Sequence, residues 1–565
     1  MHKTSYRVLL INFIVLFFSF IIISRFFYIQ IIRHSKLSKY AQTEYERKTK
    51  EIMPRGEILD INSKVLASSI LKWDLVIMKK EMEEEKNIDK LSKNLAAVSK
   101  ITSIPLNDLK NKINKGKNYI KIKKLIERDE YLELSNLNMK GLLLEPHQAR
   151  IYPAETAREI IGLANENEGL TQIERVMNDY LKGNVVTKEM IKDNKGNIIK
   201  VVNEISDEKP SKVYLTLEEE IQVLLEDTIK KYYKELNCKR IIAIVQNVEN
   251  GFITALASYP PDYINLSPFE FVYEPGSTFK TFVLSAGFEE NLIKEDEYID
   301  CENGKWQFSL KHTITDHEAL KTIKVIDVYA HSSNIGFAKI GLKIGIEKLY
   351  PYIKKFGFDS KYTQFPGESK GIVKDFKSYR DVDTLTTSYG YGIAVTPLQL
   401  VNAYTAIANS GILLKPQIIY KIEGERENIE YKKEEIRRVI SKETVDRIKD
   451  MMINVVESGT GVNAQIPGYF IAGKTGTANK LDLKTRKYIK GENVGSFCGF
   501  FPAKNPKYTI LIIVDNSKKY KYGGQTSAPI FADIAKQIIS LKNIKQEREV
   551  DFSKLNKKSS VNIFN

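Results

Sequence analysis

The stretch EPGSTFKTF, residues 274–282, places a serine three residues before a lysine, directly after Pro-Gly. If the chain is helical after the glycine, Ser277 and Lys280 lie one turn apart on the same helix face. Ser277 then occupies the first turn, where unpaired N–H groups and the helix dipole stabilise developing negative charge. This arrangement fits a serine nucleophile with a lysine base. The spacing alone is weakly specific, because it recurs at residues 69–72 and 206–209.

Two further motifs follow in the same half of the chain. SSN, residues 332–334, offers a second hydroxyl and an amide before a predicted helix, although alone it is an ordinary helix N-cap. KTGT, residues 474–477, lies in a strand-like run, where a glycine often marks close approach by a ligand. Ser-x-x-Lys, Ser-x-Asn and Lys-Thr-Gly in this order are far more specific than any one of them, and they indicate an enzyme that acylates a serine.

A phosphate-binding loop is the rival interpretation of the third motif. GYFIAGKT, residues 468–475, matches Gly-x-x-x-x-Gly-Lys-[Ser/Thr] by residue type. Such a loop needs a turn between a strand and a helix, whereas Tyr469, Phe470 and Ile471 are strand formers that continue into Thr-Gly-Thr-Ala. The context therefore disfavours a nucleotide site.

The motifs resemble the transpeptidase domain of class B penicillin-binding proteins. The resemblance covers EPGSTFK, HSSNIGFAKIGLKIG, SYGYGIAVTPLQL and AGKTGTA, and it extends to PRGEILD, ARIYP and LTLEEEIQ earlier in the chain. Asn334 favours the division-type branch, because the elongation-type branch more usually has an aspartate there. The resemblance implies a peptidoglycan D,D-transpeptidase of cell-wall synthesis, acting at the division septum and inhibited by β-lactams. A sporulation-specific transpeptidase of the same family is the alternative.

The resemblance also implies a role for each motif residue. Ser277 is the expected nucleophile, which attacks the penultimate D-Ala carbonyl of a stem peptide ending in D-Ala-D-Ala. Lys280 is the expected base, and burial together with a nearby Lys474 should lower its pKa. Ser332 is expected to relay a proton to the leaving amine, and Asn334 to hold the backbone amide of the substrate.

The KTGT strand is expected to hold the terminal carboxylate of the substrate through Lys474, Thr475 and Thr477. The resemblance places the oxyanion hole at the backbone N–H groups of Ser277 and Thr477. Gly476 should leave room for the substrate to lie against the strand. No metal or other cofactor is expected.

Three other functions use similar motifs. A serine β-lactamase would hydrolyse the acyl-enzyme with an activated water, but an N-terminal anchor and a large non-catalytic module disfavour it. A β-lactam sensor usually brings more membrane segments than one. A degenerate scaffold that recruits division proteins is disfavoured by the intact motifs.

The composition excludes some classes of protein. The 565 residues carry a net charge of +15, but the basic residues are mixed with acidic ones, and no nucleic-acid partner is expected. Cys238, Cys301 and Cys498 are far apart and lack metal-type spacing, so neither a disulfide framework nor a zinc site is indicated.

The N-terminus predicts a membrane anchor. VLLINFIVLFFSFIII, residues 8–23, is apolar except for two residues, and FFYIQII continues it beyond Arg25. Its length suits a membrane-spanning helix, and no small-x-small cleavage site follows. We expect a single-pass protein of the cytoplasmic (inner) membrane, with a cytoplasmic N-terminus and an extracytoplasmic catalytic domain. The family resemblance adds a polytopic glycosyltransferase of the shape, elongation, division and sporulation (SEDS) family and other division proteins as partners.

The predicted fold class is α+β and multidomain. The expected parts are residues 1–34, a cytoplasmic tip and transmembrane anchor; 35–210, a stalk and an extended mixed α/β pedestal (dimerisation-type) domain; 211–545, the transpeptidase (penicillin-binding) domain; and 546–565, a polar tail. The transpeptidase domain should contain an antiparallel sheet flanked by helices, with a helical lobe beside it.

Several local elements are predicted as well. Thr216 with Glu219 predicts a capping box for a helix that follows. The charged pattern over residues 81–128 predicts helices broken at Ile104-Pro105, and residues 274–408 are predicted to be largely helical. Three strands and a closing amphipathic helix are expected after residue 468.

Overall fold

The computed structural model describes residues 2–165, 168–183, 185–192, 198–206, 209–310, 312–425, 427–482, 485 and 487–549. Its contacts divide the chain into two compact units. The smaller unit comprises Met1–Pro54 and Gly183–Pro210, and the larger one comprises Arg55–Lys182 and Ser211–Asn565. The predicted boundaries at 34/35, 210/211 and 545/546 stay predictions, and residues 550–565 of the predicted tail lie outside the described residues.

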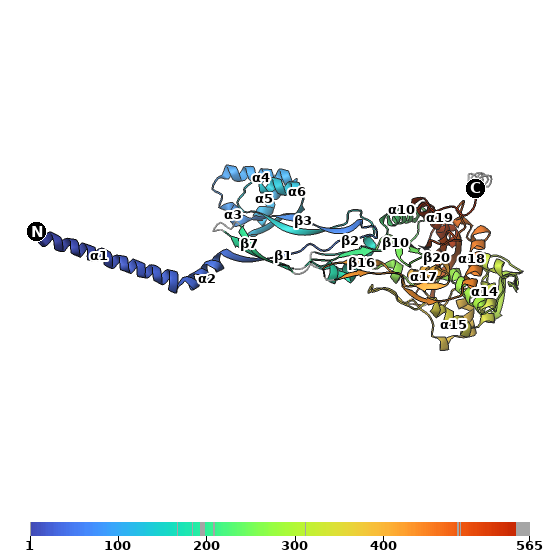
Figure 1. Cartoon of the computed structure of the whole chain (residues 1–565). Helices are drawn as coiled ribbons and strands as arrows, with labels where there is room; N and C mark the ends of the chain where they lie inside the picture. The colour runs from blue at the N-terminus through green and yellow to red at the C-terminus, as the bar shows by residue number, and fades with distance from the viewer. Residues whose placement is uncertain are drawn as a thin grey trace. The chain divides into compact units, whose positions relative to one another are not determined.

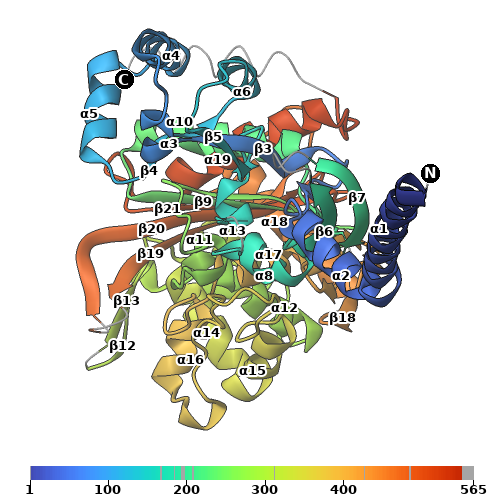
Figure 2. The same cartoon turned by 90° about the vertical axis from the view of Figure 1, so that its left-hand side faces the viewer.

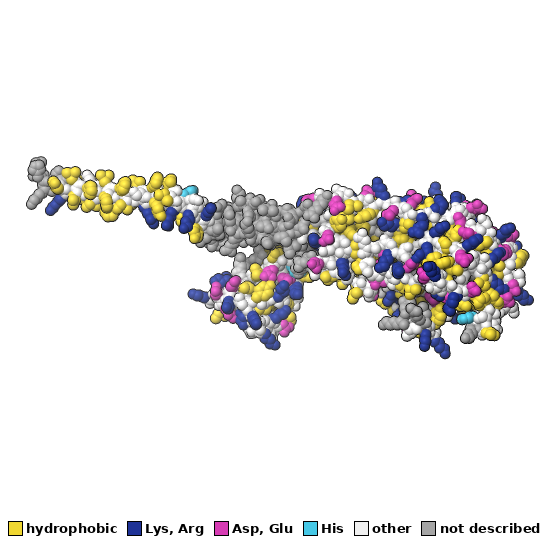
Figure 3. Space-filling model, turned by 90° about the horizontal axis from the view of Figure 1, so that it is seen from below, with side chains coloured by type: hydrophobic (Ala, Val, Ile, Leu, Met, Phe, Trp, Pro, Cys, Tyr) yellow, Lys and Arg dark blue, Asp and Glu magenta, His cyan; other side chains and the backbone are white. Residues whose placement is uncertain are grey.

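The smaller unit contains a long N-terminal helix and a three-stranded antiparallel sheet of order β1-β6-β7. The segment Tyr6–Ile32 has a mean hydropathy of 2.4, and none of its residues is buried. Hydrophobic side chains line the visible face of this helix (Figure 3). Within the described residues it is the one helix long and apolar enough to span a membrane. The elements are α1 (His2–Phe27), η1 (Tyr28–Ile32, π-helical), α2 (His34–Tyr45), β1 (Glu46–Ile52), β6 (Val185–Lys192) and β7 (Ile198–Ser206).

The N-terminal part of the larger unit is built on a seven-stranded sheet. Its strand order is β17-β16-β8-β2-β3-β4, and β5 pairs with β3. Strands β8, β16 and β17 fall within the predicted transpeptidase domain, residues 211–545, so one sheet joins the predicted pedestal to that domain. The strands are β2 (Ile58–Leu59), β3 (Val65–Met78), β4 (Tyr119–Ile126), β5 (Leu142–Ile151), β8 (Lys212–Leu215), β16 (Ile419–Glu423) and β17 (Asn428–Glu430).

Short helices pack against β3, β4 and β5 (Figure 1). The predicted break at Ile104-Pro105 is confirmed, because Pro105 lies between α4 and α5. The helical prediction is wrong for residues 119–126, where buried Ile120 and Ile122 alternate with lysines at the period of a strand. The helices of this part are α3 (Lys79–Glu83), α4 (Ile88–Thr102), α5 (Leu106–Lys115), α6 (Arg128–Ser135), α7 (Arg158–Ile161), α8 (Gln172–Val176) and α9 (Asn178–Leu181).

The C-terminal part is built on a five-stranded antiparallel sheet of order β10-β9-β21-β20-β19. Helices α10 and α19 cover one face, and the helices of a lobe cover the other (Figure 2). Both faces are buried, which explains why β9 reads as a continuous apolar run. The elements are α10 (Glu219–Leu236), β9 (Arg240–Asn247), β10 (Ile253–Tyr259), β19 (Ala472–Asp482), β20 (Lys487–Phe501), β21 (Tyr508–Asp515) and α19 (Gly523–Leu541). This architecture confirms the predicted fold class.

The helical lobe also contains short strands that the sequence analysis missed. Residues 298–324 form two small antiparallel pairs, β11 with β14 and β12 with β13, so the prediction of a largely helical region is wrong there. The lobe comprises α11 (Ser267–Glu270), η2 (Gly276–Phe279), α12 (Lys280–Glu289), β11 (Tyr298–Asp300), η3 (Glu302–Gly304), β12 (Lys305–Ser309), β13 (His312–Thr315), β14 (Thr322–Lys324), α13 (Val325–Ala330), α14 (Asn334–Ile344), α15 (Ile346–Lys355), η4 (Phe376–Ser378), α16 (Asp381–Ser388), α17 (Pro397–Ala408), β15 (Ile412–Leu414), β18 (Glu435–Arg438), α18 (Lys442–Glu457) and η5 (Val462–Ala464).

The capping box predicted for α10 is wrong. The N-cap residue is Glu218, and its side chain makes no capping hydrogen bond. The Thr216 hydroxyl lies 2.7 Å from the carbonyl oxygen of Ile253 and 2.9 Å from that of Gln417. The Thr216 hydroxyl is therefore engaged by backbone carbonyls of two distant segments and does not cap the helix, contrary to what the local pattern predicts.

Candidate active site

A cleft of about 990 Å³ lies between the edge strand β19 and the helical lobe. Its lining includes five of the predicted site residues: Ser277, Ser332, Asn334, Thr475 and Thr477. Lys280 and Lys474 are fully buried behind it. The structure thus brings the three motifs together, although they are separated by up to about two hundred positions in the sequence.

Ser277 lies in a 3-10 turn, residues 276–279, and Lys280 begins α12 directly after it. The Ser277 hydroxyl has no hydrogen-bond partner among the described residues. Gly276 has φ +52°, and a Cβ there would lie 3.0 Å from the carbonyl oxygen of Thr477. A glycine at this position therefore lets the turn of residues 276–279, which carries the candidate nucleophile and is called the nucleophile turn below, lie directly against β19.

Lys280 makes three hydrogen bonds in a buried environment. Its Nζ donates to the carbonyl oxygen of Ser332 (2.6 Å) and to Asn334 Oδ1 (2.9 Å), and it lies 3.3 Å from Ser332 Oγ. Burial lowers the pKa of Lys280 to about 7, although the carboxylate of Asp316 raises it in part. Lys280 is therefore about half deprotonated at neutral pH, which a base requires.

Lys474 approaches the same serine from β19. Its Nζ donates to Ser332 Oγ at 2.9 Å. Burial lowers the pKa of Lys474 well below its ordinary value, and the charge of Lys280 lowers it further. The sequence analysis expected burial and Lys474 together to lower the pKa of Lys280. Burial is the main cause at Lys280, and the electrostatic effect between the two lysines is seen at Lys474.

Ser332 bridges the two lysines from an unusual backbone conformation. It follows α13 with φ +62°, a left-handed region that residues other than glycine seldom adopt. The next residue, Ser333, is the N-cap of α14 and accepts a hydrogen bond from Gly336 N (2.9 Å). The predicted helix cap is therefore confirmed, and it belongs to the middle residue of the motif. The strained turn directs the Ser332 hydroxyl toward Lys474.

Asp316 is a site residue that the sequence analysis missed. Its carboxylate accepts hydrogen bonds from Ser333 Oγ (2.5 Å), Asn334 N (2.5 Å) and Ile335 N (3.1 Å). Asn334 is held at its other end as well, because its Nδ2 donates to Thr315 O (3.2 Å). The segment after β13 thus fixes the SSN motif. Its sequence, TDHE, contains no pattern that would have indicated this role.

Strand β19 presents hydroxyls that already have partners. Thr475 Oγ1 lies 2.7 Å from Thr460 Oγ1, and Thr477 Oγ1 accepts a hydrogen bond from Gly523 N (3.0 Å). The missing side chain of Gly476 does not open space in the cleft. A Cβ there would lie 2.9 Å from a methyl carbon of Thr278 and 2.4 Å from Ser496 Oγ. The space that the sequence analysis assigned to substrate is occupied by the nucleophile turn and β20.

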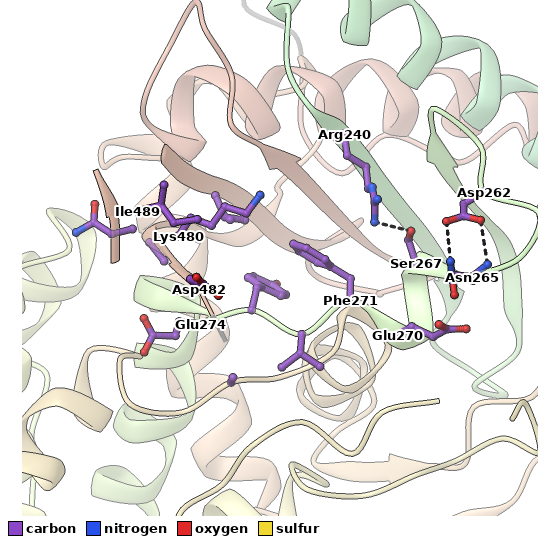
Figure 4. A pocket seen from close by; sticks show the side chains of 16 residues that line it. Arg240, Asp262, Asn265, Ser267, Glu270, Phe271, Glu274, Lys480, Asp482 and Ile489 are labelled. Atoms are coloured by element: carbon purple, nitrogen blue, oxygen red, sulfur yellow. Dashed lines mark hydrogen bonds between the residues drawn. The ribbon is translucent and has the colours of Figure 1, made fainter. Parts of the chain in front are cut away.

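A second pocket, of about 550 Å³, lies beside the segment that precedes Ser277. Figure 4 shows Arg240 donating to Ser267 (2.9 Å) and the Asp262–Asn265 contacts in its wall. None of the predicted site residues lines this pocket. The larger cleft is therefore the candidate active site.

Two protein-family models match consecutive parts of the chain. A model of the penicillin-binding protein transpeptidase domain matches residues 241–536, and a model of the penicillin-binding protein dimerisation domain matches residues 50–215. The chain is 31% identical to stage V sporulation protein D of Bacillus subtilis (strain 168), over 94% of this chain and 84% of that protein. It is 32% identical to peptidoglycan D,D-transpeptidase FtsI of Buchnera aphidicola subsp. Schizaphis graminum, over 94% of each chain.

Solved structures share the fold. Penicillin binding protein 2X from Streptococcus thermophilus matches with a TM-score of 0.73 and 24% identity, over 88% of this chain and 80% of that one. The matched domains define a serine acyltransferase with a dimerisation module and a transpeptidase module. The chain belongs to the class B penicillin-binding proteins, as its motifs predicted.

Proposed function

We propose that this enzyme cross-links peptidoglycan stem peptides ending in D-Ala-D-Ala through an ester on Ser277, at the division septum. One observation carries the proposal. The Ser277 hydroxyl, which has no hydrogen-bond partner in the described part of the chain, faces a cleft. There two buried lysines converge on a second hydroxyl, that of Ser332. Nucleophile, base and proton relay therefore lie together in one site.

In the first half-reaction, neutral Lys280 takes the proton of the Ser277 hydroxyl while Oγ attacks the penultimate D-Ala carbonyl. The C–N bond to the terminal D-Ala then breaks, and the leaving nitrogen receives a proton through Ser332. The backbone N–H groups of Ser277 and Thr477 are the proposed donors to the developing oxyanion. Losing one such donor typically costs about 3 kcal/mol of barrier.

The terminal carboxylate of the substrate decides where the positive charge of the lysine pair lies. We assign its binding to Lys474 with the hydroxyls of Thr475 and Thr477. A bound carboxylate favours the charged form of Lys474, and that charge disfavours a proton on Lys280. Substrate binding therefore leaves Lys280 as the free base. Asn334 is the proposed partner of the substrate backbone amide, and Gly476 contributes through its backbone.

In the second half-reaction, an amine of a neighbouring stem attacks the ester carbonyl. A C–N bond forms, the C–Oγ bond breaks, and the proton lost from nitrogen restores the Ser277 hydroxyl. One peptide bond replaces another, so the exchange needs no external energy source. β-Lactams would acylate the same serine.

Placement in the cell is part of the proposal. The apolar helix would cross the cytoplasmic (inner) membrane once, with residues 1–34 as tip and anchor and a cytoplasmic N-terminus. Residues 35–210, 211–545 and 546–565 would then lie outside as pedestal, transpeptidase domain and tail. A SEDS-family glycosyltransferase and other division proteins are the proposed partners. The similarity to stage V sporulation protein D favours a sporulation-specific role as the second candidate.

Intact-mass spectrometry of the detergent-solubilised full chain with a penicillin tests the chemistry. We expect an adduct of one penicillin per chain that persists for many minutes, and none with Ser277→Ala. Labelling retained by Ser277→Ala would show that another residue is the nucleophile. An adduct lost within seconds would indicate a β-lactamase, and no adduct at all would leave a non-enzymatic scaffold.

A further inference from the structure

A chain of three fully buried hydroxyls lies next to the nucleophile turn, and none of its members lines the cleft. The hydroxyl oxygens of Tyr329 and Tyr404 each lie 2.8 Å from Thr281 Oγ1. The Tyr404 hydroxyl also donates to the carbonyl oxygen of Thr278 at 2.8 Å. These residues belong to α13, α17, α12 and the nucleophile turn, so the chain of hydroxyls joins four segments of the lobe.

The direction of each hydrogen bond in this chain follows from the number of protons. Burial raises the pKa of Tyr329 and of Tyr404, so both phenols keep their proton at neutral pH. Each hydroxyl has one proton to donate, and Tyr404 donates its proton to Thr278, so it accepts from Thr281. The proton of Thr281 is then engaged, so Thr281 accepts from Tyr329. Donation therefore runs from Tyr329 through Thr281 and Tyr404 to the carbonyl oxygen of Thr278.

One end of the chain acts on the residue that follows the candidate nucleophile. Thr278 is fully buried, and its methyl group meets β19, since a Cβ on Gly476 would lie 2.9 Å from it. Tyr404 contacts the carbonyl group of the same residue. A shift of the nucleophile turn relative to β19 would therefore disturb one contact or the other. The proposed oxyanion donors, Ser277 N–H on the turn and Thr477 N–H on β19, depend on this separation.

The other end of the chain lies against the turn that carries the proposed proton relay. Ser332 N donates to the carbonyl oxygen of Tyr329 at 3.2 Å. Lys474 Nζ, which donates to Ser332 Oγ, lies 5.6 Å from the centroid of the Tyr329 ring. The hydroxyl chain thus links the two turns whose side chains must meet at the reacting carbonyl group.

We propose that Tyr329, Thr281 and Tyr404 are positioning residues, which hold the nucleophile turn in register with β19 and with the turn of Ser332. They act through Thr278 and do not touch the substrate. Reacting groups must stay within about 0.5 Å of their productive geometry, so loss of the chain should slow acylation and leave prior binding unchanged. This inference rests on the proposed transpeptidase function and deepens it by naming residues outside the cleft that the reaction needs.

Three substitutions each remove one hydroxyl of the chain. Tyr404→Phe removes the donor to Thr278 and should slow acylation by about tenfold or more, because a small displacement of reacting groups is enough for such a loss. Thr281→Val leaves that donor in place but no longer polarises it, so we expect a loss of about threefold. Tyr329→Phe removes only the first donor and should change the rate by less than about twofold.

The comparison of Tyr404→Phe with Thr281→Val separates positioning from stability. Each variant loses two hydrogen bonds and leaves one buried O–H group without an acceptor, so both should lose similar unfolding free energy. Only Tyr404→Phe loses the contact with the nucleophile turn. A purely structural chain would therefore give equal acylation rates in folded molecules of the two variants, whereas a positioning chain gives a slower rate in Tyr404→Phe.

Stopped-flow acylation of the detergent-solubilised full chain, at increasing concentrations of a penicillin, measures the effect. It gives the limiting rate of acylation and, separately, the dissociation constant of the complex that precedes it. We expect only the limiting rate to fall. This first-order rate does not depend on how much of the protein is folded, and denaturant unfolding of each variant measures its stability.

The matched controls make the same substitutions at buried hydroxyls outside the chain. The hydroxyls of Tyr273 and Thr509 are buried and have no hydrogen-bond partner among the described residues. Tyr273→Phe and Thr509→Val should therefore keep the wild-type limiting rate. Thr281→Ser keeps the hydroxyl that Thr281→Val removes, and it should restore most of the rate.

A limiting rate of Tyr404→Phe equal to that of Tyr273→Phe would overturn the proposal. So would a Thr281→Val variant that is slowed as much as Tyr404→Phe. The wild type separates this failure from a failure of the proposed function. If penicillin acylates the wild type and the three variants at the same rate, the positioning chain alone is wrong. If penicillin does not acylate the wild type, the proposed function is wrong.

Discussion

Two groups of buried cations in the larger unit differ in what balances their charge. In the pedestal part, Arg55 and Arg150 donate to the two oxygens of Glu174 at 2.5 and 2.7 Å, and all three side chains are almost fully buried. In the candidate active site, Lys280 and Lys474 are equally buried, but among the described residues they donate only to hydroxyl, amide and carbonyl oxygens. A carboxylate offsets one of the two charges of the first group, whereas no described carboxylate contacts the second.

The difference separates a structural cluster from a reactive one. An arginine does not release its proton in proteins, and with a buried counter-ion it holds two segments together. A lysine without a counter-ion escapes the penalty of burial by losing its proton, which makes it a base. Buried charge in this chain therefore signals function where the cation is lysine and no carboxylate contacts it.

Lys280→Met should give the largest effect. Acylation by penicillin is expected to slow by about 10³-fold, since a general base typically contributes 10²–10⁴. The same variant should be more stable at pH 7 by about 1 kcal/mol. At pH 7 the lysine is fully protonated in the unfolded chain but only partly protonated in the folded one, so proton uptake favours unfolding. Methionine takes up no proton, so this destabilising contribution disappears in the variant. The loss of the hydrogen bonds of Lys280 offsets part of the gain in stability.

Stopped-flow acylation and denaturant unfolding in detergent measure the two effects. Trp73 lies in the pedestal part and Trp306 in the hairpin beside α14, so each fluorescence signal reports on its own region. A variant that is both inactive and strongly destabilised would contradict the contrast between the two groups. Lys280→Arg is the matched control for charge, and it should be inactive as well, because arginine stays protonated.

Glu174→Gln should have the opposite effects to Lys280→Met: a loss of stability without a loss of acylation rate. Removing the counter-ion leaves two buried arginines uncompensated, and we expect a loss of about 3–5 kcal/mol of unfolding free energy. The Trp73 signal should report it, while the acylation rate of folded molecules stays the same. Asp179→Asn is the control, because this carboxylate is 88% exposed and pairs with Lys182 on the surface. It should cost at most about 1 kcal/mol. A Glu174 effect as small as that of Asp179 would contradict the account.

Asp316→Asn should give the smallest effect. The carboxylate of Asp316 raises the pKa of Lys280, so its removal should shift the acid limb of the acylation rate to lower pH. Asparagine keeps an acceptor for the backbone N–H groups of α14, so the SSN turn should persist. A limb that stays in place, or moves to higher pH, would show that Asp316 does not influence Lys280 electrostatically.

The sequence predicted the residues that meet at the cleft because the motifs are short and contiguous. EPGSTFK, SSN and KTGT each place their residues within one turn or one strand, so local spacing predicts which side chains act together. The three C-terminal strands and the closing helix followed from periodicity, because each is a contiguous run of sequence. The long apolar helix at the N-terminus followed from length and apolarity alone.

The supporting contacts could not be predicted, because they come from distant segments without a motif. Asp316 reaches the SSN turn from the residue after β13, and Thr460 reaches Thr475 from the turn after α18. The space beside Gly476 was assigned to substrate, since nothing local shows that the nucleophile turn occupies it. Thr216 failed as a helix cap in the same way, when two tertiary carbonyls took its hydroxyl.

The pH dependence of Ser277 acylation tests the central claim, that burial without a counter-ion makes Lys280 the base. Stopped-flow acylation by penicillin would be followed from pH 5 to 9 on the wild-type full chain. The account predicts a rate that rises about tenfold per pH unit and levels off near pH 7, where Lys280 has lost its proton. A rate that keeps rising through pH 9, as for a lysine of ordinary pKa, would contradict it, and so would a rate independent of pH.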